Sequence, residues 1–206
     1  MSEEFGALSP ERIGRATASR IKDVIAKTKA GPGASRINYL AELVAERLTG
    51  EPYPSFQNAA MKWGNDVEPS ARAAYALHAG TDIKPLGFVR HPTIIMAGAS
   101  PDGGIGTKGL VEFKCPNTAT HIATLQGAEI ETGYIAQIYF QQACTGAEWT
   151  DWVSFDPRLP ERMQLFVKRI KRNDDMIAQL EHEVRSFLNE VAATVEQLEK
   201  QYGKAA

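Results

Sequence analysis

The sequence has few cysteines, no long apolar run and little net charge, and each shortage excludes a class of protein. Its two cysteines, Cys115 and Cys144, are too few for a disulfide framework, a four-thiolate zinc site or an iron–sulfur cluster. Any metal is therefore expected to be a hard ion held by oxygen. No apolar stretch could cross a bilayer, and the opening Met-Ser-Glu-Glu-Phe lacks the pattern of a signal peptide. We expect a cytoplasmic protein without membrane contact.

The charge balance also argues against a general nucleic-acid coat, because the net charge is −2 and the pI is near 6.1. A local nucleic-acid site is still compatible with this balance, since divalent cations can supply positive charge between protein and phosphate. The chain has 206 residues, of which 43% are hydrophobic and 23% charged. This is enough for one good-sized core, so we expect a single domain over residues 1–206.

Apolar periodicity and capping residues predict a mixture of helices and strands. The expected helices are 17–27, a second capped by Asn38 and closed by Gly50, then 58–78, 130–144 and the amphipathic 174–202. The expected strands are 87–90, 93–97, 110–114, 149–155 and 165–170. The polar segment 29–36 reads as an exposed, mobile loop.

One glycine-rich segment, 104–109, has the G-x-G-x-x-G spacing of a dinucleotide-binding turn. That turn must lead into a helix whose amino end faces the pyrophosphate. Here it leads into 110–114, which reads as a strand, so no helix terminus is available. We therefore predict a glycine-containing hairpin between two strands instead of a cofactor loop.

The same hairpin carries acidic and basic residues in a P-D…E-x-K arrangement. The turn can bring Asp102 and Glu112 together, and strand alternation places Glu112 and Lys114 on one face with Phe113 on the other. Two carboxylates can hold Mg²⁺, while Lys114 can orient or deprotonate water and stabilise charge on a phosphate. Taken alone, these residues are equally compatible with a turn aspartate and a solvated edge strand.

Several motifs together resemble the phage lambda exonuclease family, also called the YqaJ-type viral recombinase nucleases, within the PD-(D/E)xK superfamily. The matching segments are Arg12–Ser19, Trp63-Gly64 with Glu68, Ser100–Gly103, Glu112–Pro116, Tyr134–Gln137 and Phe155–Arg158. The resemblance implies an α/β (α+β) fold of restriction-endonuclease type, with a central mixed sheet flanked by helices. It also implies an enzyme that digests one strand of duplex DNA from a 5′ end to mononucleotides.

The resemblance further assigns roles in catalysis. Asp102 and Glu112 become metal ligands together with the Phe113 carbonyl, and Lys114 becomes the catalytic lysine. The implied cofactor is a pair of Mg²⁺ ions, for which Mn²⁺ can substitute. Two further residues, Glu68 and Gln137, are expected to support the second ion or its water and to hydrogen-bond in or near the site.

Other matched positions are expected to contact DNA. Arg12, Ser19 and Ser100 correspond to a pocket for the terminal 5′-phosphate, and the predicted helix terminus at Ser19 would attract an anion. Three more are expected to contact the duplex: Met61 as an apolar wedge, and Lys29 and Arg36 from the loop. Each also has an ordinary reading, as a helix cap, a core methionine or a solvated charge.

The family works as a ring-shaped homotrimer threaded by DNA, so the resemblance implies that assembly and a single-strand annealing protein as partner. Two other functions stay open on the sequence. One is a non-catalytic DNA-end-binding or assembly protein on the same fold. The other is an enzyme with Cys115 as nucleophile, although no histidine lies near it in the sequence.

Overall fold

A computed structural model describes residues 10–54 and 58–203 of the chain. Its helices are η1 (Pro10–Arg12), η2 (Ala18–Arg20), α1 (Ile21–Val24), α2 (Ala34–Thr49), α3 (Ala59–Ala79), α4 (Thr118–Leu125), α5 (Thr132–Thr145), η3 (Glu161–Met163) and α6 (Asp174–Tyr202). Its strands are β1 (Ala16–Thr17), β2 (Lys27–Thr28), β3 (Gly31–Pro32), β4 (Ile83–Lys84), β5 (Val89–Arg90), β6 (Ala97–Ala99), β7 (Gly103–Ile105), β8 (Gly109–Lys114), β9 (Trp149–Phe155) and β10 (Leu165–Lys171). No helix in the described ranges is both long and apolar enough to span a bilayer.

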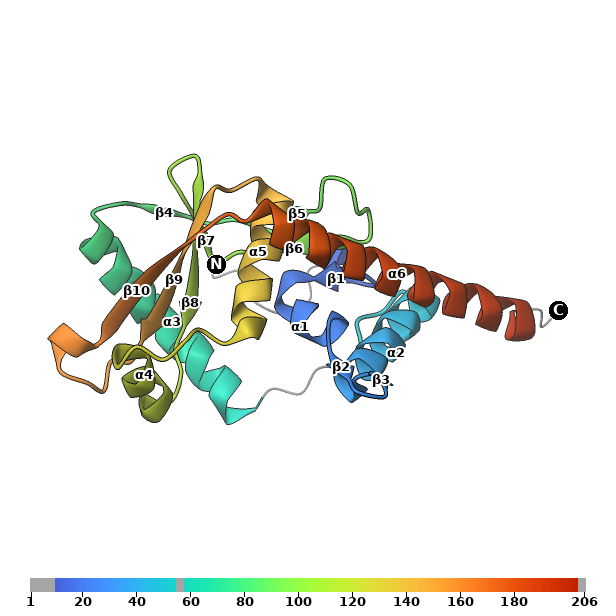
Figure 1. Cartoon of the computed structure of the whole chain (residues 1–206), viewed down its shortest axis with the longest axis horizontal. Helices are drawn as coiled ribbons and strands as arrows, with labels where there is room; N and C mark the ends of the chain where they lie inside the picture. The colour runs from blue at the N-terminus through green and yellow to red at the C-terminus, as the bar shows by residue number, and fades with distance from the viewer. Residues whose placement is uncertain (1–9, 55–57, 204–206) are drawn as a thin grey trace.

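A five-stranded mixed sheet in the order β10-β9-β8-β7-β4 forms the centre of the fold. Only the β8–β9 pair is parallel, and the other neighbours are antiparallel. Helix α3 covers one face and α5 the other, and α6 extends from α5 toward the C-terminus (Figure 1). The α/β fold with a central mixed sheet and a long C-terminal helix is confirmed.

Strand alternation on β8 decides which side chains meet each helix. Val111 and Phe113 pack with α3, where Phe113 meets the Tyr75 ring edge-on at 5.9 Å between ring centroids. Glu112 and Lys114 face α5 instead. The polar residues of this strand therefore lie between the sheet and α5.

The glycine-rich segment forms the predicted hairpin between β7 and β8, with Gly103 opposite Val111. Gly106 adopts φ +57, a conformation that L side chains rarely take. At Gly109, an added Cβ would lie 2.2 Å from the Trp149 ring, so only glycine fits beneath that indole. Gly106 is therefore required by the turn and Gly109 by the packing of the sheet. The segment is a hairpin and not a dinucleotide-binding turn.

Helix α6 packs on its own chain. Its apolar stripe is buried against α1, α2 and α5 in the core formed with the small sheet β1-β6-β5. The fully or nearly buried members of the stripe are Ile177, Leu180, Val184, Phe187, Leu188 and Val191.

Three local predictions were wrong. The single helix expected over 17–27 is divided into η2 and the four-residue α1, after β1 pairs with β6. The loop expected over 29–36 is a β2–β3 hairpin followed by α2, which begins at Ala34 and not after Asn38. The strand expected over 93–97 lies mostly in a turn, and β6 begins at Ala97.

Candidate active site

The β7–β8 hairpin brings Asp102 beside residues 112–114 of β8. The Phe113 backbone N–H donates to Asp102 Oδ2 over 2.6 Å. In a β-strand the N–H and C=O of one residue point to the same edge, so the Phe113 carbonyl is also directed toward Asp102. The hairpin thus sets Asp102 against the residue that follows Glu112, and the charge of Glu112 acts on Asp102.

Glu112 is only 2% exposed and lies among hydrogen-bond donors. Lys114 Nζ and Gln137 Nε2 donate to its Oε1 over 2.7 and 2.6 Å, and Gln141 Nε2 donates to its Oε2 over 2.7 Å. Lys114 Nζ also lies 3.4 Å from Gln137 Oε1 and 4.8 Å from the centroid of the Tyr134 ring. The structure thus places Gln137 against Glu112 and Lys114, where the sequence expected it.

Glu68 reaches the site from α3 through an arginine that sequence reasoning missed. Arg72 donates to Glu68 Oε1 over 2.7 Å and to the Asp102 carbonyl over 2.8 Å. It therefore ties the helix to the hairpin. The i,i+4 spacing of Glu68 and Arg72 is an ordinary helix pair, and it was the signal that could have flagged Arg72.

The charge balance of these residues is favourable for a cation. Burial raises the pKa of Asp102 well above its ordinary value, and the charges of Glu112 and Glu68 raise it further. Burial lowers the pKa of Lys114, but the attraction of Glu112 and Asp102 outweighs it, and the net shift is upward. The carboxylates of Asp102, Glu112 and Glu68 thus outnumber the two cations beside them, Lys114 and Arg72.

The donor set fits Mg²⁺ with substrate as co-ligand. Within the described ranges no group of three or more His, Cys, Asp and Glu side chains forms a metal cage by itself. Asp102, Glu112 and the Phe113 carbonyl supply hard oxygen donors, and Mg²⁺ in phosphate-processing enzymes typically uses one or two carboxylates plus substrate oxygens and water. The residues therefore suit a metal ion that is completed by a bound phosphate.

A second group of polar residues lies where β1 and β6 run parallel. Arg12 Nη1 donates to Ser100 Oγ over 3.1 Å, and the pairing of Thr17 with Gly98 sets Ser19 at the same end of the two strands. Burial lowers the pKa of Arg12. Among residues 10–54 and 58–203 no carboxylate lies within ion-pair distance of Arg12, so this partly desolvated cation has donors available for an anion.

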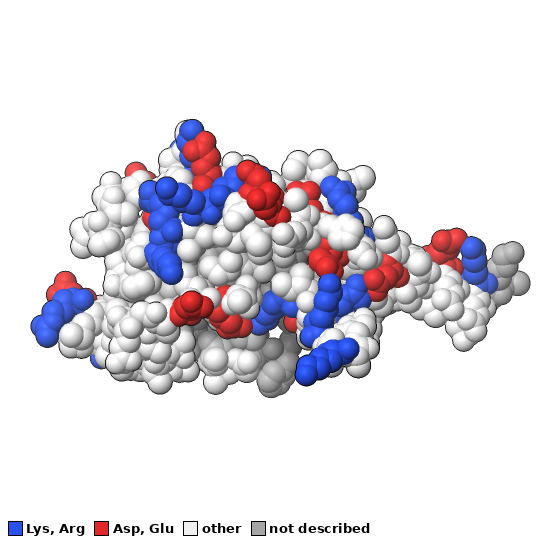
Figure 2. Space-filling view, in the orientation of Figure 1, with Lys and Arg blue, Asp and Glu red and all other residues white. Residues whose placement is uncertain are grey.

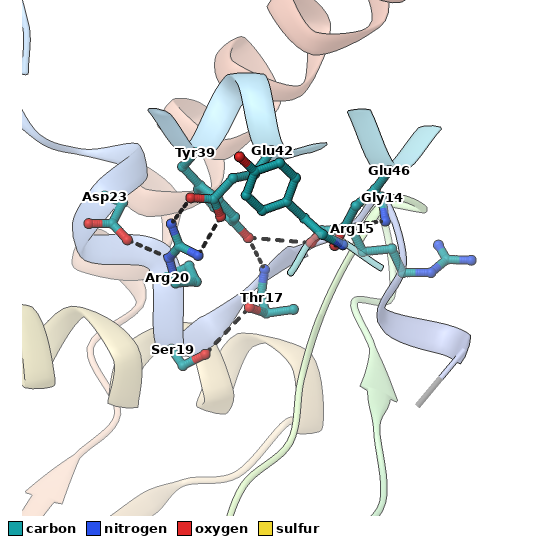
Figure 3. Close-up of polar contacts among 10 residues, drawn as sticks. Gly14, Arg15, Thr17, Ser19, Arg20, Asp23, Tyr39, Glu42 and Glu46 are labelled. Atoms are coloured by element: carbon teal, nitrogen blue, oxygen red, sulfur yellow. Dashed lines mark hydrogen bonds and ion pairs between the residues drawn. The ribbon is translucent and has the colours of Figure 1, made fainter. Parts of the chain in front are cut away.

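Helix α2 fixes the backbone of this N-terminal segment (Figure 3). Tyr39 Oη accepts from the Thr17 N–H over 3.1 Å and lies 3.3 Å from the Arg15 carbonyl. Ser19 is exposed, and its hydroxyl lies 3.4 Å from that of Thr17. Because Ser19 lies within the three-residue η2, the long-helix dipole expected there is absent, and the Arg12–Ser100 pair is the stronger anion donor.

Comparison with known proteins then decides the family. The family model described as a YqaJ-like viral recombinase domain matches residues 9–148. This chain belongs to the YqaJ-like viral recombinase family. The alkaline exonuclease LHK-Exo of Laribacter hongkongensis is 48% identical in sequence, with a TM-score of 0.87 over 95% of this chain and 96% of that one. No curated protein sequence gives a match.

Two further structures agree with this family fold. LHK-Exo in complex with dAMP is likewise 48% identical, with a TM-score of 0.88 over 96% of this chain and 97% of that one. A phage-related exonuclease of Haemophilus somnus 129PT shares 14% identity and a TM-score of 0.71, over 89% of this chain and 96% of that one. The latter supports the fold alone. The chain is thus a YqaJ-like homologue of an alkaline exonuclease.

In this YqaJ-like nuclease, two of the three residues expected to contact DNA are exposed and the third is buried. Met61 lies in the first turn of α3 and is 48% exposed, which suits a wedge better than a core methionine. Lys29 is exposed in the β2–β3 turn. Arg36 was misplaced: it is buried on α2, donates to the Val24 carbonyl and forms an ion pair with Glu190 of α6. It stabilises the helix pair and is not offered to DNA.

Cys115 lies beside the catalytic strand, but its chemistry does not suit a nucleophile. Burial, followed by the charges of Glu68 and Asp102, raises the pKa of its thiol to about 12. A thiol with this pKa is protonated at neutral pH, and the thiolate is the reactive form. The raised thiol pKa therefore argues against Cys115 as a nucleophile.

Proposed function

We propose that this YqaJ-like nuclease is a Mg²⁺-dependent 5′→3′ exonuclease of linear duplex DNA. It would release 5′-mononucleotides and leave a 3′ single strand for recombination by strand annealing. The observation that carries the proposal is the group of Glu112, Lys114 and Gln137 between β8 and α5, with Asp102 held against the Phe113 N–H just before β7. The 48% identity to an alkaline exonuclease over nearly the whole chain supports the same reaction class.

Asp102, Glu112 and the Phe113 carbonyl would hold Mg²⁺, and Glu68 would support a second ion or its water. Bound divalent ions supply Lewis acidity and a water that deprotonates near neutral pH. Lys114, oriented by Glu112 and the Tyr134 ring, would position that water and stabilise negative charge on the phosphate.

Polarity is proposed to come from the second group of residues. Arg12 and Ser100 would bind the terminal 5′-phosphate, with Ser19 at its edge, because their donors have no carboxylate partner in the described ranges. Met61, at the exposed start of α3, would separate the terminal base pairs, and Lys29 would follow the duplex backbone. The complex of LHK-Exo with dAMP is consistent with a nucleotide site in this fold.

The direct test compares linear and circular duplex DNA of the same sequence, incubated with the protein and Mg²⁺. Release of mononucleotides from the linear form only, abolished by a chelator, is the expected result. Digestion of the circular form would show an endonuclease. Binding of linear ends without digestion would instead favour the non-catalytic end-binding protein.

Replacing Arg12 by alanine is expected to remove the preference for a 5′-phosphorylated end over a 5′-hydroxyl end. The reason is loss of a charge-assisted donor, which typically contributes about 1.5–3 kcal/mol, or roughly 10- to 150-fold. Initial rates on the two substrates measure the preference. Arg185→Ala is the matched control, since Arg185 also donates to a hydroxyl, that of Thr93, and should keep the preference. An unchanged preference in Arg12→Ala would show that Arg12 does not bind the terminal 5′-phosphate.

Processive digestion is proposed to depend on a homotrimeric ring threaded by DNA. Basic and acidic side chains are interspersed on the face shown in Figure 2, and the net charge is −2, so electrostatic retention on DNA is weak. Light scattering at several concentrations is expected to give about three times the 22.6 kDa subunit mass. A monomer mass together with processive digestion would refute the ring. A single-strand annealing protein is the proposed recipient of the product strand.

A further inference from the structure

Three buried glutamines lie on α5, and they make two separate sets of hydrogen bonds. Gln137 and Gln141 donate to Glu112, one to each carboxylate oxygen. Gln142 turns the other way and donates to Thr150 Oγ1 and the Ile170 carbonyl over 3.0 and 3.1 Å. Gln141 and Gln142 are both fully buried. Sequence reasoning selected Gln137 and missed its neighbour one helical turn further on.

The donors around Glu112 leave one defined position for a cation. A carboxylate offers about four lone-pair sites, two on each oxygen. Lys114 and Gln137 use both sites of Oε1, and Gln141 uses one site of Oε2. Among the described residues nothing else donates to Oε2, so the remaining lone pair lies on the oxygen that Gln141 holds.

Gln141 is not a side chain chosen for packing alone. Its Oε1, like that of Gln142, is buried and has no hydrogen-bond partner within the described part of the chain. Turning the amide over would direct that oxygen at the Glu112 carboxylate, which is repulsive, so the present orientation is the favourable one. An unsatisfied buried carbonyl lowers stability, and an apolar side chain of the same shape would avoid it. The amide is therefore explained by its contact with Glu112.

We propose that Gln141 is a positioning residue for the metal ion: it fixes the Glu112 carboxylate plane so that the free lone pair of Oε2 faces the ion. This inference rests on the proposed metal site and extends it to a residue on α5. Partners that orient metal-binding carboxylates typically change metal affinity by 10- to 100-fold when they are removed. Gln141 contacts no substrate in this scheme and acts through Glu112.

The test compares Gln141→Met with Gln142→Met, two changes of equal size on adjacent residues of one helix. Mn²⁺ binding is measured by calorimetry without DNA, and the melting temperature is measured with chelator. Gln141→Met is expected to weaken Mn²⁺ binding by about 10- to 100-fold and to raise the Mg²⁺ concentration for half-maximal nuclease activity in parallel. Gln142→Met should lower the melting temperature and leave Mn²⁺ affinity within about twofold, because it lies outside the Glu112 group.

Wild-type Mn²⁺ affinity in Gln141→Met, or equal losses in the two variants, would overturn the proposal. If Gln141→Met does not fold, Gln141→Asn keeps an amide that is too short to reach Glu112, and the same loss is expected. The outcome is separable from that of the proposed function. Weakened Mn²⁺ binding in a protein that cuts no linear DNA would refute the exonuclease alone, and unchanged Mn²⁺ binding in an active exonuclease would refute the role of Gln141 alone.

Discussion

Asp102→Asn is expected to lower the turnover of linear duplex by at least about 10²-fold while leaving the metal-free protein no less stable. A metal-ion contribution of several kcal/mol to the transition state corresponds to this loss, since each 1.36 kcal/mol is tenfold. The asparagine carbonyl can still accept from the Phe113 N–H, so the hairpin remains intact. Removing the charge also relieves the burial of a charged group and its repulsion from Glu112 and Glu68, the two causes that raise the pKa of Asp102.

Turnover with saturating Mg²⁺ and the melting temperature in chelator measure the two effects separately. Lys114→Ala should also lower the melting temperature in chelator, because it leaves the buried Glu112 without its cation. Asp82→Asn, an exposed position before β4, is the control and should change neither quantity. Near wild-type turnover in Asp102→Asn would contradict the proposed role of Asp102 as a metal ligand.

The second large effect concerns stability. Phe187→Ala on α6 is expected to lower the free energy of unfolding by about 3–5 kcal/mol, the usual cost of deleting a buried aromatic ring. Phe187 is fully buried, stacks on Tyr39 at 5.4 Å between centroids, and lies beneath the Arg36 guanidinium. Chemical denaturation measures the change. The helix that carries Arg36 and Tyr39 would lose its main contact.

Leu198→Ala is the control for this prediction. Leu198 belongs to the same apolar stripe but is only partly buried near the end of α6, so its loss should be much smaller. Comparable losses at Leu198 and Phe187 would mean that a neighbouring subunit covers the end of α6. A small loss at Phe187 would contradict the packing of α6 on its own chain.

Elements with a strong local signal were predictable from the sequence. Residues 174–202 repeat apolar side chains every three or four positions, and α6 has the predicted bounds. Helix α3 lies close to the predicted bounds 58–78, and its caps explain why: the Asn58 side chain accepts from the Met61 N–H, and Gly80 has φ +60. The shared face of Glu112 and Lys114 was predictable because strand alternation alone places them together.

Elements fixed by distant contacts were not predictable. Helix α4 was missed because its threonines are weak helix formers, and its place depends on His121, which bonds to Ser154 Oγ and the Met163 carbonyl. Arg36 was assigned to a loop because its partner Glu190 lies 154 residues away. Gln141 was not selected, since nothing local in the sequence reveals that it contacts Glu112.

The position of β8 between β7 and β9 also has a consequence for the nascent chain. Asp102, Glu112 and Lys114 leave the ribosome well before Gln137 and Gln141, which lie 25 and 29 residues after Glu112, and before the parallel neighbour β9. Until β9 pairs with β8, the β7–β8 hairpin lacks both the glutamine donors to Glu112 and its parallel neighbour strand. In a partly synthesised chain the candidate site is therefore incomplete, and it forms only after long-range closure.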